Sequence, residues 1–152
     1  MRANTPKHIL IPVDFSEHSG RALTYGASMA KELGARVLAL HVLRPAFRYI
    51  PLEESVWGAT VTVDQLSKLL EENAKQSFET FLEQQPEAIR GSIDHEVVLG
   101  DPAHAVLDRA EKGDVDLIVV GSHGREGISR WVMGSVAERI VRHAHCPVLV
   151  VH

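Results

Sequence analysis

Short apolar runs alternate with longer amphipathic segments along this chain of 152 residues. The apolar runs are 8–13, 36–42, 92–99, 116–120 and 148–151. Runs of this length are typical of strands buried on both faces of a parallel sheet, and the polar–apolar alternation at the start of 92–99 is typical of an edge strand. The segments between the runs carry apolar residues at helical spacing. This order predicts an α/β fold with one five-stranded, doubly wound parallel sheet.

Two apolar stripes define the faces by which the first two helices would pack. The first helix would begin at the N-cap Ser16 and end at Gly34, a residue suited to the left-handed conformation that follows a helix. Its stripe is Ala22, Gly26, Met29, Ala30 and Leu33. The stripe of the second helix is Leu66, Leu69, Leu70, Ala74, Phe78, Phe81 and Leu82, with Pro86 beyond the helix end.

The third and fourth helices also carry boundary signals. Asp101 and Pro102 suit the N-cap and first turn of the third helix, and Gly113 suits its end. Ser135 and Glu138 have the spacing of a capping box, which predicts that the fourth helix begins at Ser135.

A long connection, residues 43–62, separates the second strand from the second helix. It contains Phe47, Tyr49 and Trp57. A connection of this length in a compact domain is unusual unless it has a function. Two interpretations stay open: the aromatic side chains pack on the sheet edge, or the segment forms a lid over a ligand.

Composition restricts the class of protein. The apolar content of 45% and the length suit one soluble globular domain, and the net charge of −4 gives no reason to expect nucleic-acid binding. The single cysteine, Cys146, excludes an internal disulfide framework and suits a reducing compartment. The sequence shows neither the apolar core of a signal peptide nor an apolar run long enough to span a membrane. We therefore expect a cytoplasmic protein.

Segment 121–135, GSHGREGISRWVMGS, carries the clearest chemical signal. It follows a predicted strand and precedes a predicted helix, and its glycines have the spacing G-x2-G-x9-G-S. Backbone amides of such a loop and of the following helix N-terminus can form a concave anion site. The spacing is neither a Walker A loop nor a Rossmann fingerprint. The alternative is a glycine-rich surface turn without a ligand.

Other candidate chemistry is weaker. His123, His143, His145 and Cys146 do not have the spacing of a common zinc site, so we expect no metal held by these side chains. We expect His143 and His145 to lie in the turn before the last strand. His41, at the end of a predicted strand, is expected to be half-buried with its hydrogen bonds satisfied. No Walker B aspartate, water-positioning base or nucleophile elbow is evident, which argues against an enzyme. The segment after the first strand also lacks the Ser, Thr and Gly run that a flavin phosphate would need.

Several segments resemble the universal stress protein family. They are 119–125 (VVGSHGR), 134–139 (GSVAER), 146–151 (CPVLVV), 9–16 (ILIPVDFS), 40–42 (LHV) and 99–102 (LGDP). The resemblance covers essentially the whole chain, and the glycine spacing is that of the ATP-binding branch of the family. From the residues alone, strand order stays open between flavodoxin-like and Rossmann-like arrangements. The resemblance implies the order 3-2-1-4-5, in which the winding reverses between the first and fourth strands.

The resemblance also implies a site at that reversal, where open α/β sheets bind ligands. Asp14 would accept a hydrogen bond from the adenine amino group, unless it only helps to start the first helix. Arg125 would meet a phosphate, unless it is a solvated loop residue. The neighbouring Glu126 leaves AMP or ADP open beside ATP. The implied nucleotide-binding residues are Pro12, Val13, Asp14, Val42, Val120, Gly121, Ser122, His123, Gly124, Arg125, Gly134, Ser135 and Val136.

The expected function is therefore that of a regulatory protein that binds an adenine nucleotide. Mg²⁺ would arrive with the phosphates. The family forms a homodimer through its last strand, which implies the same role for residues 147–152. Two alternatives stay open: a slow ATPase or phosphotransferase, and a nucleotide-free interaction scaffold.

Overall fold

The computed structural model of the protein describes residues 5–45, 62–123 and 133–152. It contains a five-stranded parallel sheet in the order β3-β2-β1-β4-β5, which confirms the expected fold and strand order. The strands are β1 (His8–Pro12), β2 (Arg36–Leu43), β3 (Ile93–Leu99), β4 (Leu117–Gly121) and β5 (Val148–Val151). As expected from its alternating residues, β3 is an edge strand. Of the long connection, residues 46–61 with Phe47, Tyr49 and Trp57 lie outside the described residues.

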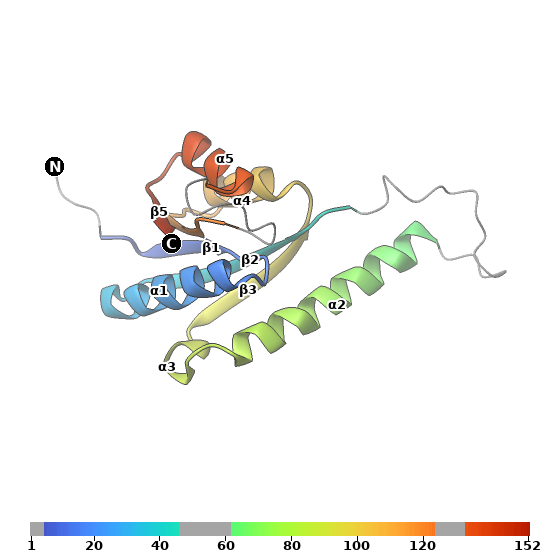
Figure 1. The fold of residues 1–152 in the computed structure, drawn as a ribbon, viewed down its shortest axis with the longest axis horizontal. Helices are drawn as coiled ribbons and strands as arrows, with labels where there is room; N and C mark the ends of the chain where they lie inside the picture. The colour runs from blue at the N-terminus through green and yellow to red at the C-terminus, as the bar shows by residue number, and fades with distance from the viewer. Residues whose placement is uncertain (1–4, 46–61, 124–132) are drawn as a thin grey trace.

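Helices cover both faces of the sheet (Figure 1). They are α1 (Glu17–Leu33), α2 (Val63–Glu83), α3 (Glu87–Arg90), α4 (Pro102–Lys112) and α5 (Ser135–His143). One face packs against α1, α2 and α3, and the other packs against α4 and α5. The sequence pattern did not reveal α3, because four residues are too few to show helical periodicity.

The two-sided burial of the strands explains their continuous apolar runs. In β1, Ile9 and Ile11 face the α1 side while Leu10 faces the α4 side, and all three are fully buried. In β4, Val119 and Ile118 divide in the same way. Side chains alternate between the faces of a strand, so a strand covered on both sides needs apolar residues at every position.

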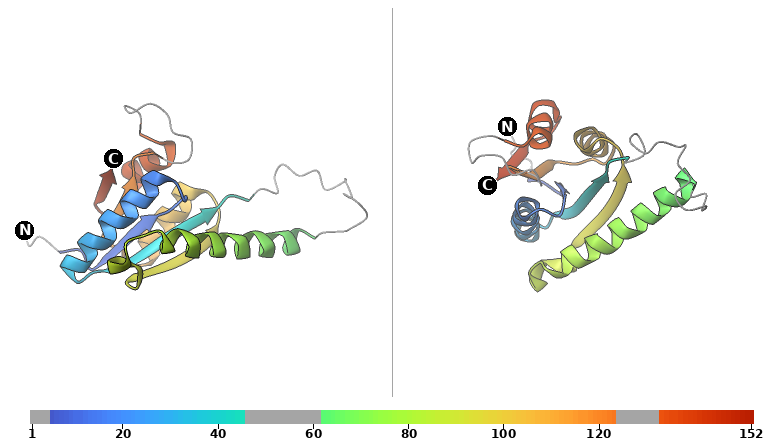
Figure 2. Two further views of the ribbon diagram at one scale, coloured as in Figure 1. Left: turned by 60° about the horizontal axis from the view of Figure 1, so that its bottom comes forward. Right: turned by 45° about the vertical axis from the view of Figure 1, so that its right-hand side comes forward.

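Winding reverses at β1, the central strand. From β1 the chain passes through α1 to β2 on one side, and later returns through α4 to β4 on the other side of β1. Figure 2 shows α1 and α4 on opposite faces of the sheet. The register pairs Leu10 with Ile118, so β1 and β4 run side by side toward the same edge.

Side-chain hydrogen bonds cap the starts of α1 and α2, the first as predicted. The Ser16 side chain accepts a hydrogen bond from the Ser19 amide, and Gly34 ends α1 with φ of 64°. Thr62 and Gln65 form a complete capping box at the start of α2.

Two predicted core residues are exposed. Leu33 is 40% exposed at the last position of α1, and Leu69 is 52% exposed in α2. Burial in α2 begins only at Ala74, and the N-terminal half of this helix extends beyond the sheet (Figures 1 and 2). Helical spacing gives the direction of a face, but not how far the neighbouring sheet reaches.

No helix in the part of the chain that the structure describes combines the length and the apolar character needed to cross a lipid bilayer.

Asp101 fixes the start of α4, as predicted. Its Oδ1 accepts hydrogen bonds from the His104 amide and from Nη1 of Arg139 on α5, each at 3.0 Å. The hydrogen bond from His104, followed by the Arg139 guanidinium, holds the pKa of the Asp101 carboxyl below its ordinary value despite partial burial. The same carboxylate therefore caps one helix and ties it to the next.

Replacing Asp101 by alanine is expected to lower the free energy of unfolding at pH 7 by about 1 kcal/mol, because α4 loses its N-cap. Asp101→Asn keeps an acceptor oxygen and should lose less. The folded-state pKa is depressed, so the contribution of the charge is present above the unfolded pKa of about 3.9 and disappears as pH falls through the folded pKa. Urea denaturation between pH 7 and pH 3 measures both effects. A constant difference between wild type and Asp101→Asn across this range would contradict the role of the charge.

Candidate functional site

The carboxyl ends of β1 and β4 meet at the winding reversal, as the family resemblance implied. β1 ends at Pro12 and β4 ends at Gly121. Asp14 lies just beyond β1, and segment 121–135 begins at the last residue of β4. The edge between these two strands is the place where sheets of this kind bind ligands.

Asp14 is part of the turn that starts α1. Its Oδ1 accepts hydrogen bonds from the amide of Ser16 at 3.0 Å and from the Ser16 hydroxyl. That hydroxyl in turn caps α1 through the Ser19 amide. The carboxylate therefore supports the helix start, one of the two roles left open by the sequence, while it remains half-buried at the strand end.

Val13 and His41 are held together beside Asp14. The Val13 amide donates to the Leu40 carbonyl at 2.8 Å, and the Val13 carbonyl lies 2.7 Å from His41 Nδ1. His41 is only 8% exposed, so it is more buried than expected, and it has the predicted satisfied hydrogen bond. Its ring stacks on Phe15 with a centroid separation of 4.2 Å. This packing holds Phe15 at φ of 64°, a conformation that bulky residues rarely adopt.

Gly121 is small for a reason that the sequence did not reveal. A Cβ atom at this position would lie 2.8 Å from the carbonyl oxygen of His18, in the first turn of α1. The glycine therefore lets α1 approach the end of β4. Its small size is required by the protein itself, whether or not a phosphate also approaches this backbone.

Segment 121–135 is closed at its base by the backbone. The Gly134 amide donates to the Ser122 carbonyl at 2.8 Å, and the Ser122 amide donates to the Val151 carbonyl of β5 at 2.9 Å. These bonds bring the start of α5 back to the end of β4. The Gly134 amide already has a partner within the protein, so this residue would contribute to an anion site chiefly by positioning α5.

The predicted capping box of α5 is wrong. Gly134 is the N-cap, Ser135 is the first helical residue, and no side chain caps the helix. The Glu138 amide donates to the Gly134 carbonyl at 2.9 Å, while the Glu138 side chain pairs with Arg142 at 2.8 Å. The hydrogen bond from the Gly134 amide to the Ser122 carbonyl fixes the turn into α5 at Gly134, one residue before Ser135, the N-cap of the predicted capping box. The first turn of α5 therefore presents backbone amides and the positive end of its dipole without a capping side chain.

The other predicted site residues divide into three groups. Val42, Val120 and Val136 belong to the apolar layer between the sheet and α4 and α5, with Val120 buried and the others partly buried. Pro12 is partly buried at the end of β1. Gly124 and Arg125, together with Glu126, lie outside the described residues.

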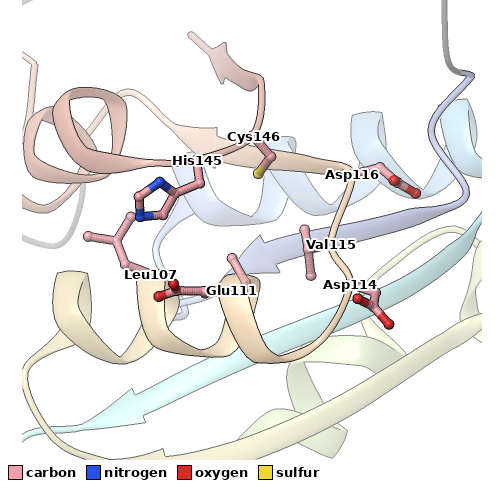
Figure 3. A pocket seen from close by; sticks show the side chains of 8 residues that line it. Leu107, Glu111, Asp114, Val115, Asp116, His145 and Cys146 are labelled. Atoms are coloured by element: carbon pink, nitrogen blue, oxygen red, sulfur yellow. The ribbon is translucent and has the colours of Figure 1, made fainter.

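Two pockets have linings that differ from the set of predicted site residues. One of about 380 Å³ is bounded by the end of α4, the segment before β4 and the turn before β5 (Figure 3). Leu107, Glu111, His145 and Cys146 contribute to its lining. It adjoins the amino ends of β4 and β5, opposite the carboxyl ends. The second runs along α1 and includes Phe15 and Val151. Neither lining includes Asp14, Gly121 or Gly134.

The histidines near the last strand do not form a cluster. His143 is the final residue of α5, so the expectation that it lies in the following turn is wrong, while His145 does lie in that turn. Within residues 5–45, 62–123 and 133–152, no group of three or more His, Cys, Asp or Glu side chains lies close enough together to hold a metal ion. Burial raises the pKa of the Cys146 thiol, which keeps it protonated at neutral pH.

The fold defines a doubly wound α/β protein with a candidate ligand edge between β1 and β4. The model of the universal stress protein family matches residues 5–152. Universal stress protein MJ0531 of Methanocaldococcus jannaschii is 38% identical over 149 residues, covering 97% of this chain and 83% of that protein. The chain belongs to the universal stress protein family, which confirms the resemblance seen in the sequence.

Solved structures show the same fold. Universal stress protein UspA from Lactobacillus plantarum has a TM-score of 0.74 at 27% identity, covering 96% of this chain and 97% of that one. The universal stress protein from Archaeoglobus fulgidus in complex with dAMP has a TM-score of 0.60 at 22% identity, covering 96% and 98% of the two chains.

Proposed function

We propose that the edge between β1 and β4 binds an adenine nucleotide, and that the protein is a nucleotide-responsive binding module of the stress response. The observation that carries the proposal is the 2.8 Å hydrogen bond from the Gly134 amide to the Ser122 carbonyl. It brings the uncapped N-terminus of α5 to the carboxyl end of β4, where an anion would meet backbone amides and a positive dipole. The family member solved with dAMP supports adenine as the base.

The nucleotide would span the two strand ends. Its base would lie near Asp14 and its phosphates near segment 121–135. ATP, ADP and AMP all fit this arrangement, and Mg²⁺ would come with the phosphates. The described residues that would meet the phosphates offer backbone amides and the Ser135 hydroxyl, donors that suit an anion.

A binding role is favoured over catalysis. Ser122 and His123 form a hydroxyl–imidazole pair at 2.9 Å, but Ser122 is only 1% exposed, so a substrate cannot reach its hydroxyl as a nucleophile. A regulatory role requires ATP to bind two states of the protein with different affinity. A two-fold dimer through β5 supplies such a state. β5 occupies one edge of the sheet, where its outer backbone groups are available to a second copy.

Ser135 offers a sharp test, since it is exposed at the first position of α5. Ser135→Asp places a carboxylate beside the phosphates and is expected to weaken ATP binding at least tenfold relative to Ser135→Asn, which has nearly the same shape. Two like charges about 4 Å apart near a protein surface repel by up to about 4 kcal/mol, so a tenfold loss is a conservative expectation. The negative charge of the new aspartate also interacts favourably with the positive end of the α5 dipole, so the stability of the apo protein should not fall.

Isothermal titration calorimetry with ATP, ADP, AMP and GTP measures these affinities, after nucleotide has been removed from the purified protein. AMP should be less sensitive than ATP to Ser135→Asp, because fewer phosphates approach the helix. Light scattering with and without ATP reports the dimer, and phosphate release reports hydrolysis. Wild-type protein that binds no adenine nucleotide, or equal ATP affinity in the two variants, would contradict the proposal. ATP turnover that Ser135→Asp abolishes would favour the slow ATPase instead.

A further inference from the structure

Two histidines that are distant in sequence meet beside the base of segment 121–135. His18 lies in the first turn of α1, and His123 is the second residue after the end of β4. Their ring centroids are 5.1 Å apart, with an interplanar angle of 47°. They meet because Gly121 lets the first turn of α1 pack against the end of β4. Sequence patterns do not indicate this pair, since His18 belongs to no motif and the spacing of the two residues matches no metal-binding pattern.

Each ring has a buried nitrogen without a partner. His18 Nδ1 and His123 Nε2 are inaccessible to solvent, and neither forms a hydrogen bond. Buried polar atoms in native proteins almost always have a partner, and an exception calls for an ordered water or an ion. Here the two orphaned atoms belong to neighbouring imidazoles that are tilted by 47° to each other, and imidazoles are common metal ligands.

The separation of the rings fits a shared metal ion. A metal about 2.0–2.1 Å from an imidazole nitrogen lies about 3.2 Å from the ring centroid, so a tetrahedral angle between two such ligands places the centroids about 5.2 Å apart. The observed 5.1 Å agrees with this value. A direct stack of the rings would bring the centroids closer, as in the Phe15–His41 pair at 4.2 Å.

Ser122 supplies the outer contact that such a site requires. Its Oγ lies 2.9 Å from His123 Nδ1. When Nδ1 carries the proton and donates it to this hydroxyl, Nε2 keeps a free lone pair. Metal-bound histidines are typically oriented in this way by a hydrogen bond from their other nitrogen. Ser122 is itself fixed by backbone bonds to Val151 and Gly134.

We propose that His18 Nδ1 and His123 Nε2 together bind a divalent transition-metal ion, with Zn²⁺ as the best match. Imidazole nitrogen suits Zn²⁺ far better than Mg²⁺, which prefers oxygen. In the described part of the chain no third His, Cys, Asp or Glu side chain adjoins the pair, so water or anion oxygens would have to complete the tetrahedron. Zinc sites with open positions exchange such ligands readily. This site does not depend on the proposed nucleotide, since both nitrogens belong to the apo protein.

Co²⁺ is the probe, because its visible absorption band reports tetrahedral coordination. The full chain without an affinity tag, stripped of metal and nucleotide, is titrated with Co²⁺ and then with Zn²⁺ as competitor. We expect one equivalent of Co²⁺ per chain with a tetrahedral band. His18→Gln and His123→Gln should each weaken binding at least tenfold, and Ser122→Ala should weaken it about tenfold through the loss of the outer contact. The double variant His143→Gln/His145→Gln removes the other closely spaced histidines and should bind as wild type does.

Thermal unfolding gives a second measurement. Zn²⁺ should raise the melting temperature of wild type and of the His143/His145 double variant, but not that of the His18 or His123 variants, because only a folded site gains from binding. Far-UV circular dichroism establishes that each variant is folded. The proposal is overturned if wild type shows no tetrahedral band with excess Co²⁺, which would indicate a bridging water only. Equal Co²⁺ affinity in wild type and His18→Gln would also overturn it.

Discussion

Replacing Phe78 by alanine is expected to lower the free energy of unfolding by about 4 kcal/mol, the largest stability change that we predict. Phe78 is fully buried on α2. Its ring centroid lies 5.0 Å from that of His95 on β3, 5.6 Å from that of Phe15 and 6.4 Å from that of His41. Alanine would leave a cavity among three rings that come from different elements. Urea denaturation measures the loss, and calorimetry should show the melting temperature falling by about 8–16 °C.

Leu69→Ala is the matched control on the same helix. Leu69 is 52% exposed, so its truncation should change the free energy of unfolding by less than about 0.5 kcal/mol. Alanine favours the helix at both positions, so similar losses in the two variants would contradict a contribution that comes from burial in the aromatic cluster. The cluster also reaches the candidate site, because Phe78 packs edge-on against Phe15, the residue after Asp14. Phe78→Ala should therefore weaken ATP binding at temperatures where the variant is still folded.

Replacing Gly121 by alanine is expected to lower the free energy of unfolding by about 3 kcal/mol, even without a nucleotide. The added methyl group would lie 2.8 Å from the His18 carbonyl oxygen and 2.9 Å from the His18 carbonyl carbon. Both are backbone atoms of a helix packed on the sheet, so relief requires α1 to move away from β4. Urea denaturation of the apo protein measures the effect.

Gly91→Ala is the control for Gly121→Ala. An added Cβ at Gly91 would meet nothing within 4 Å, and its φ of −74° suits any residue. This variant should keep wild-type stability. If Gly121→Ala also kept wild-type stability and lost only nucleotide affinity, the glycine would serve the ligand and not the packing of α1.

Gly121 and Gly134, near the two ends of segment 121–135, show how far a motif can be interpreted from sequence. The segment lies between a strand and a helix, as predicted. The glycine spacing did not indicate that Gly121 is needed by α1, or that Gly134 and not Ser135 caps α5. Both facts depend on backbone atoms of residues remote in sequence. The ligand that this loop would hold stays a prediction, supported by the family and by the closed base of the loop.

The sequence by itself determined the strands, their burial on both faces and most helix ends. These features depend on side-chain alternation and on hydrogen bonds that span three or four residues, as at Ser16 and Asp101, so the information is local. Only the tertiary structure decided which small or polar residues meet across the sheet edge. The close approach of His18 to Gly121 and the pairing of His18 with His123 follow from the placement of α1 against β4. Distances between elements far apart in the chain fix that placement, and no local pattern encodes them.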